Sequence, residues 1–371
     1  MQSGNPRNPW SSLFLSWSLA LLLSACRSSP TTLQARAEPA ARRVFIEEPI
    51  RTTDADIAMR NLEAQIDHLQ RLTARGASTA GQRAGLVELI AARAQYTGSV
   101  ADREQALALA ENLAREFPNQ PVALLARARS RAALHRFAES LADLDHAAGL
   151  GASPAAVAGL RAVVYQALGR YDEAFALRRA SAEHNPSADN LGALASVQAA
   201  RGRVDDAARL FAEARWSYRD ISPFPLAFLY FDEGAMWMLH GDLERARALF
   251  TAAHRRLPAF AAARCYLAEV EAALGERDAA IARLTPLARA ADDPHAAALL
   301  ARILADAGRA DEAAAWRSAA ARRYEELVAA HPDAYGDHAA ELWLDAGGPT
   351  QFTLPLARHA PAPRRLARTS W

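Results

Sequence analysis

Residues 227–253 read AFLYFDEGAMWMLHGDLERARALFTAA. The first half of this stretch carries an aromatic residue, a glycine four residues later and an aromatic three residues further on: Tyr230, Gly234 and Trp237. At helical spacing these three positions share one face. Gly241 follows as the predicted end of the helix, because glycine readily adopts the positive φ of a helix-terminating turn.

The second half of the stretch predicts another helix that packs against the first. Ala246, Phe250 and Ala253 recur at the i, i+4, i+7 spacing of a helix face. The small side chain of Ala246 lets the two helices approach, and Phe250 fills the space beside it. Pro258 then ends the unit, because proline interrupts a helix. Together the two halves predict a helical hairpin.

Position 246 belongs to a series of small residues that repeats through the chain. Successive members are 34, 34, 33, 39, 34 and 33 residues apart, and they are Ala106, Ser140, Ala174, Ala207, Ala246, Ala280 and Ala313. A period near 34 indicates hairpins that stack so that each buries a face on the next. We therefore expect an all-α solenoid of about seven antiparallel hairpins with capping helices at its ends, an architecture that holds other molecules.

This pattern resembles the tetratricopeptide repeat family, whose unit is about 34 residues long. The resemblance covers roughly residues 87–327. It implies a right-handed superhelical solenoid in which the first helix of each unit lines a concave groove. We expect a capping-helix region at 54–86, the repeats at 87–345 and a basic tail at 346–371.

The first residues of the chain predict export and lipidation. Leu13–Leu23 is an apolar run of eleven residues, too short to span a bilayer but typical of a signal peptide. The sequence LSAC at 23–26 resembles the lipobox of bacterial lipoproteins, which implies removal of residues 1–25 and lipidation of Cys26. By resemblance to enterobacterial sorting, Arg27 after the cysteine favours the outer membrane.

The segment after the predicted cleavage site has the composition of a linker, and the chain that remains after cleavage has no net charge. Residues 26–53 are rich in serine, threonine and proline, which predicts a flexible tether. Without residues 1–25 the chain holds 42 basic and 42 acidic side chains, so nothing in its charge favours nucleic acid as a partner. Cys265 is the remaining cysteine, and we expect it to be a buried thiol.

By the family resemblance, partner-binding side chains would come from the first helices of the hairpins. The candidates are Arg129, Gln166, Asp189, Ser196, Phe228, Phe231, Asp232, Trp237, Met238, Tyr266, Glu269, His295 and Arg302. Neither charge sign dominates among them. The alternative interpretation of each is a residue on a solvated helix face.

One interval of the series, between Ala207 and Ala246, is 39 residues long and contains an aromatic cluster. Seven of the 27 aromatic residues lie within 22 positions: Trp216, Tyr218, Phe224, Phe228, Tyr230, Phe231 and Trp237. We call residues 216–237 the aromatic junction. Clustered aromatics form binding hot spots, but they also fill volume where a solenoid bends, and both interpretations stay open.

No motif predicts catalysis. His338 and Glu341 stand one helical turn apart, but a metal hydrolase would need a second histidine at matching spacing. Gly149 and Gly151 lack the third glycine and the preceding strand of a nucleotide-binding loop. We expect a protein that is not an enzyme and that holds no cofactor or metal.

These features together predict a lipid-anchored scaffold of the bacterial envelope. Its partner would be another envelope protein bound in the groove, and its place would be the periplasmic side of the outer membrane, in assembly or export. The alternative is a protein that binds a glycan or an exported polymer at the aromatic junction.

Overall fold

The computed structural model describes residues 50–345, which form sixteen α-helices and no strand. In chain order these are α2 (Ala55–Ala74), α3 (Ala80–Thr97), α4 (Val100–Glu116), α5 (Pro121–Ala133), α6 (Phe137–Gly149), α7 (Pro154–Ala167), α8 (Tyr171–His184), α9 (Ala188–Ala200), α10 (Val204–Ser217), α11 (Pro223–Leu239), α12 (Leu243–Arg256), α13 (Ala261–Ala273), α14 (Arg277–Ala290), α15 (His295–Asp306), α16 (Ala310–Ala330) and α17 (Pro332–Asp345). The predicted signal peptide, Cys26, most of the tether and the basic tail lie outside the described residues.

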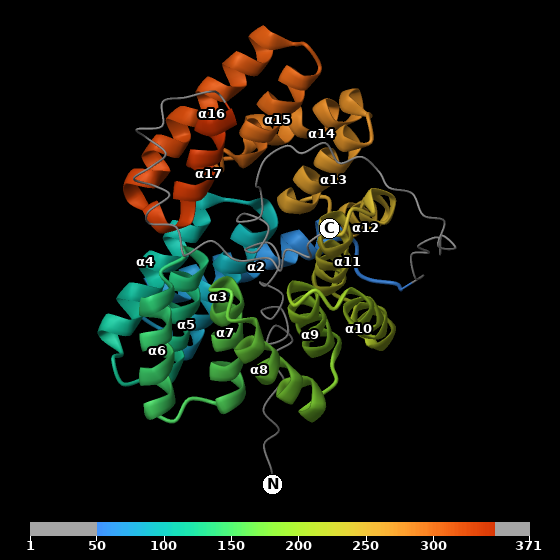
Figure 1. The fold of residues 1–371 in the computed structure, drawn as a ribbon. Helices are drawn as coiled ribbons and strands as arrows, with labels where there is room; N and C mark the ends of the chain where they lie inside the picture. The colour runs from blue at the N-terminus through green and yellow to red at the C-terminus, as the bar shows by residue number, and fades with distance from the viewer. Residues whose placement is uncertain (1–49, 346–371) are drawn as a thin grey trace.

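Seven antiparallel hairpins form the solenoid, from α3–α4 to α15–α16, with α2 before them and α17 after them (Figure 1). The predicted all-α solenoid of stacked hairpins is confirmed. Each member of the small-residue series lies on the second helix of its hairpin, and none is more than 2% exposed. The series therefore marks where the two helices of each hairpin approach closely.

The hairpin α11–α12 shows why the residues quoted first are decisive. A Cβ at Gly234 would lie 2.9 Å from two ring atoms of Phe250, so only glycine fits at this crossing without a shift. Gly241 closes the turn with a φ of 85°. The Asp242 carboxylate then caps α12 by accepting the backbone N–H of Arg245 at 3.0 Å.

Most hairpin turns place a glycine with positive φ five residues before the member of the series, as Gly241 stands before Ala246. In the second hairpin this place, five before Ser140, is taken by His135 with a φ of 59°. An L-residue is strained in this left-handed region. The histidine therefore costs backbone energy that a glycine would not.

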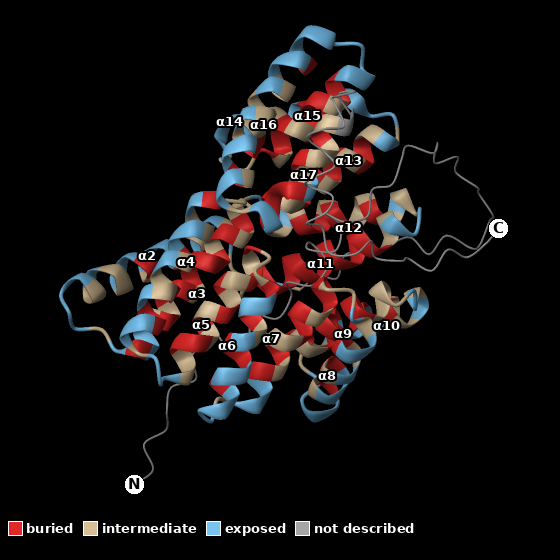
Figure 2. Ribbon diagram, turned by 60° about the vertical axis from the view of Figure 1, so that its left-hand side comes forward, coloured by how far each residue is buried: buried red, intermediate tan, exposed pale blue. Residues whose placement is uncertain are grey.

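The aromatic junction supplies core residues through α11. Phe224, Tyr230 and Phe231 are fully buried and Phe228 is nearly so, which places them in the interior that Figure 2 shows in red. Phe224 stacks on Tyr96 of α3 with ring centroids 4.4 Å apart and planes 4° apart. The fifth hairpin thus packs on the first, across the inside of the solenoid.

Candidate functional site

The two ends of the solenoid meet at the start of α4. The backbone N–H groups of Val100 and Ala101 donate to the carboxylate of Asp292, at 2.9 and 2.8 Å. Asp292 lies in the loop between α14 and α15. The loop that joins the sixth and seventh hairpins therefore caps α4, a helix of the first hairpin. A carboxylate at this place satisfies backbone donors and is favoured by the helix dipole.

An ion pair stands beside this cap. Arg103 of α4 lies 3.0 Å from the carboxylate of Asp293 and donates to the hydroxyl of Tyr335 at 3.1 Å. Burial alone would raise the pKa of Asp293, but the charges of Arg103 and His295 outweigh it and hold that pKa below its usual value. The ion pair thus persists in its charged form.

Two histidines add contacts between the ends. His331 Nε2 lies 3.0 Å from a carboxylate oxygen of Glu104. His135 Nδ1 lies 3.0 Å from the carbonyl oxygen of Asp333 at the start of α17. The strained turn residue of the second hairpin therefore contacts the far end of the chain. Figure 1 shows this meeting of α16 and α17 with α4 and α5.

A cavity of about 270 Å³ lies at this closure, between α3–α5 on one side and α13–α17 on the other. Much of its wall is alanine, from Ala91, Ala94, Ala106, Ala133, Ala261, Ala262, Ala291, Ala296, Ala298 and Ala334. Because these side chains are single methyl groups, the helices meet without filling the space. The cavity therefore lies between the first and last hairpins of the solenoid.

Polar and aromatic groups line the rest of the cavity. His295 and His338 face each other with ring centroids 6.0 Å apart, and His338 stacks over Tyr324 at 6.5 Å. Arg103 and Glu341 also reach the wall. This mixture of methyl groups, rings and a few hydrogen-bonding groups is typical of small-molecule and side-chain pockets. Within residues 50–345 no three histidine, cysteine or acidic side chains are grouped to hold a metal ion.

Four of the predicted groove residues meet in this cavity: Phe228, Tyr266, His295 and Arg302. Glu269 lies just outside it and accepts from Arg302 at 2.8 Å, so two predicted residues on neighbouring first helices pair with each other. Residues that the sequence predicted on first helices therefore form part of one wall of the cavity.

The other predicted residues lie elsewhere. Arg129 pairs with Glu88 of α3. Phe231 is packed among Phe250, Phe260 and Tyr266, with ring centroids 5.0 to 5.6 Å away. It is therefore a core residue with no exposed face.

Trp237 and Met238 are half-buried near the end of α11. The Trp237 indole donates to Glu233 at 3.4 Å, and the guanidinium of Arg245 lies 4.4 Å from its ring centroid. Asp189 is half-buried on α9, where burial and the charge of Asp220 raise its pKa to about 7.

Three of the predicted polar residues are buried. Asp232 and Ser196 pair across α11 and α9, with Ser196 Oγ 3.0 Å from Asp232 Oδ2. Burial raises the pKa of Asp232 to about 8. Gln166 is fully buried on α7, and neither atom of its amide has a hydrogen-bond partner among the described residues.

Sequence reasoning missed the residues that close the solenoid, above all Arg103, Asp293 and Tyr335. Their pairing depends on how far the superhelix turns over seven hairpins, which no local pattern records. One local signal was available, because His135 stands where other hairpins have glycine. A strained non-glycine residue at a repeated turn indicates a side chain with a role of its own.

None of the helices between residues 50 and 345 is long and apolar enough to cross a membrane. Five of the seven rings of the aromatic junction on which a glycan would stack are buried, whereas Trp216 is 75% exposed and Trp237 is half-buried.

Comparison with known proteins supports the repeat assignment. A family model for the tetratricopeptide repeat matches residues 238–303. The fold is similar to that of human IFIT1. The dimer with m7Gppp-AAAA is 13% identical over 81% of this chain and 76% of that chain, with a TM-score of 0.54. The dimer with PPP-AAAA is 14% identical over 79% and 76%, with a TM-score of 0.53.

The APC/C hetero-tetramer Cut9–Hcn1 matches at 13% identity and a TM-score of 0.49, over 79% of this chain and 56% of that chain. This chain thus spans just over half the length of that protein. At 13–14% identity the similarity to IFIT1 shows the fold alone. No curated protein sequence matches the chain.

Proposed function

We propose that this tetratricopeptide-repeat protein is a lipid-anchored scaffold of the bacterial envelope that holds a segment of a partner protein in the cavity at its closure. Tetratricopeptide repeats commonly bind other proteins. The observation that carries the proposal is the cavity itself, in which groove residues of α11, α13 and α15 face methyl groups of α3 and α5. Anchoring through Cys26 would place the scaffold in the periplasm, at the outer membrane.

The size of the cavity favours one or two inserted side chains rather than a long peptide. A volume of about 270 Å³ is just below the range of pockets that bury a drug-sized molecule. Its alanine walls suit an apolar side chain, and Arg302, His295 and His338 can hydrogen-bond the backbone beside it. A buried anchor of this kind supplies most of the affinity at typical hot spots.

A photocrosslinking side chain introduced at Ala262, on the cavity wall, tests partner binding in intact cells. The matched control carries the same group at Ala180, which is exposed on α8 away from the cavity. We expect a defined crosslinked protein from position 262 only, and its loss when Ala298→Leu narrows the cavity. Equal crosslinks from both positions, or crosslinks that survive Ala298→Leu, would contradict binding in the cavity.

The anchor is tested separately by Cys26→Ser. We expect the wild-type protein to incorporate labelled fatty acid and to sediment with outer-membrane fractions, and the variant to do neither. Each CH₂ group of an acyl chain contributes about 0.8 kcal/mol to membrane binding, so loss of the chains should release the protein. Membrane binding of the variant at the wild-type level would contradict the anchor.

A further inference from the structure

The loop between α10 and α11 exposes large apolar side chains. Trp216, at the end of α10, is 75% exposed, and Ile221 is 69% exposed. Ile57, in the first turn of α2, is 45% exposed. We call Ile57, Trp216 and Ile221 the apolar edge. Ile57 and Ile221 belong to neighbouring segments, because the backbone N–H of Thr53, four residues before Ile57, donates to the carbonyl oxygen of Ile221. Exposed apolar groups of this size on neighbouring segments are typical of a surface that another body covers.

The loop is held in place by its own hydrogen bonds. The Tyr218 hydroxyl donates to the carbonyl oxygen of Ser222 at 2.5 Å. The Asp220 carboxylate accepts the backbone N–H groups of Ile221 and Ser222 at 2.6 and 3.2 Å. Because these hydrogen bonds fix the backbone of the loop, Trp216 and Ile221 are held in exposed positions.

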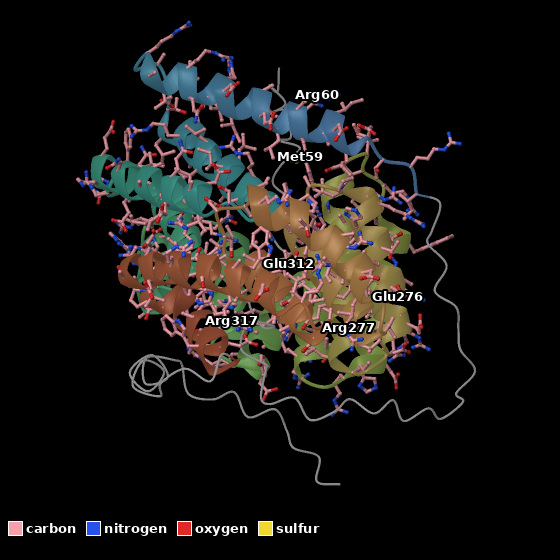
Figure 3. The ribbon with its side chains drawn as sticks, turned by 90° about the horizontal axis from the view of Figure 1, so that it is seen from above. Met59, Arg60, Glu276, Arg277, Glu312 and Arg317 are labelled. Atoms are coloured by element: carbon pink, nitrogen blue, oxygen red, sulfur yellow. The ribbon has the colours of Figure 1, made fainter. Side chains whose placement is uncertain are left out.

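The described chain enters the fold beside this loop. The backbone N–H of Thr53 donates to the carbonyl oxygen of Ile221 at 2.6 Å. Arg256 donates to the carbonyl oxygen of Ile50 at 2.6 Å and to the Thr52 hydroxyl at 3.2 Å. α2 then leads away from this edge, and Figure 3 labels Met59 and Arg60 on its first half. Ile50, the first residue that the structure describes, therefore lies in the segment beside the apolar edge.

We propose that the apolar edge rests on the lipid surface to which the protein is anchored. This inference depends on the proposed lipidation of Cys26. If the 23 residues from 27 to 49 form the tether that their composition predicts, a flexible chain of that length has a root-mean-square length of about 26 Å, which would keep the edge within reach of the membrane. Such tethering lets a weak surface contact be occupied most of the time.

The chemistry of the edge suits the interface between headgroups and acyl chains. Tryptophan prefers this depth because its ring is apolar and its N–H is polar, and isoleucine favours the acyl chains. Arg51 and Arg219 are exposed beside the edge, where guanidinium groups can pair with lipid phosphates. The occupant that this combination favours is therefore a phospholipid surface.

A nitroxide label at Ile221→Cys in the full lipidated protein tests the contact. The protein is reconstituted in vesicles of phosphatidylethanolamine and phosphatidylglycerol, and an Ala180→Cys variant carries the control label on α8. The native Cys265 stays unlabelled because it is buried, and burial raises the pKa of its thiol to about 12. Collision of the label with oxygen and with a water-soluble nickel complex reports its depth.

We expect the label at 221 to gain oxygen collisions and lose nickel collisions at least about twofold on vesicles, and the label at 180 to change little. Adding Trp216→Ser should weaken the effect at 221. Equal collision ratios at 221 and 180 in protein that floats with the vesicles would overturn the membrane contact while leaving the anchor intact. Spin–spin broadening at 221 would show a second copy on this edge and would also overturn it. Failure to float would instead overturn the anchor on which the inference depends.

Discussion

Arg103 and Asp293 form an ion pair at 3.0 Å, although 190 residues separate them in the chain. Arg103 belongs to the first hairpin and Asp293 to the loop that leads into the last. A stack of repeats usually has contacts only between neighbours. Here the superhelix returns to its start, so the first and last hairpins share one side-chain network and enclose a cavity.

The first prediction concerns this ion pair. Asp293→Asn removes the charge that Arg103 faces, and we expect a loss of about 1–3 kcal/mol, since both side chains keep some contact with solvent. The ends should separate while the hairpins stay folded. Small-angle scattering should show a larger radius of gyration, and thermal unfolding a lower midpoint. Glu312→Gln, which breaks the exposed pair with Arg309, is the control and should change neither.

Acid should open the closure in the wild-type protein. The pKa of Asp293 is lower in the folded state than in the unfolded chain, so its stabilisation is complete above about pH 4 and is lost as the pH falls through the folded value. Hydrogen exchange at the start of α4 should therefore rise below pH 4. If Asp293→Asn shows the same pH-dependent rise as the wild type, Asp293 is not the titrating group.

The local structure was predictable from the sequence because each hairpin carries its own signals. Ala246 marks the close approach of the two helices and Gly241 the turn, and both roles depend on neighbours within a few residues. The closure was not predictable, because the position of Asp293 relative to Arg103 sums small rotations over seven hairpins. The cavity walls were equally unpredictable, because the sequence around an alanine such as Ala298 is the same whether or not another helix covers that alanine.

A third prediction concerns the glycine of the quoted stretch. A Cβ at Gly234 would meet two ring atoms of Phe250 at 2.9 Å and the Cβ of Leu249 at 3.3 Å. Gly234→Ala should therefore destabilise the protein by about 1–3 kcal/mol through overpacking. Gly149→Ala is the matched control, because a Cβ there meets nothing within 4 Å and alanine favours the helix. Urea unfolding compares the two, and equal stabilities would refute the crossing described for α11 and α12.

A fourth prediction concerns Asp232, whose pKa is raised to about 8 by burial. In its neutral form the carboxyl can donate to Ser196, which can then donate to the carbonyl oxygen of Gly192 at 3.1 Å. Because the folded pKa exceeds the unfolded one, stability should fall as the pH rises from about 4 to 8. Asp232→Asn should flatten this slope in urea midpoints at pH 5, 6.5 and 8.5. Asp189 adds a slope of the same sign, so the wild-type–variant difference is the decisive quantity.

The last prediction concerns His135, the histidine in a turn position that most other hairpins give to glycine. Its φ of 59° costs about 1 kcal/mol, and its ring contacts the carbonyl oxygen of Asp333 and lines the cavity. His135→Gly removes the strain and the contact together. We expect an unchanged or higher unfolding midpoint, but faster hydrogen exchange at the start of α17 and weaker crosslinking from position 262. His135→Asn tolerates the same φ with a shorter side chain, so it should share the faster exchange. If hydrogen exchange in α17 is the same in both variants as in the wild type, the strained turn at His135 does not contribute to the contact between the two ends of the solenoid.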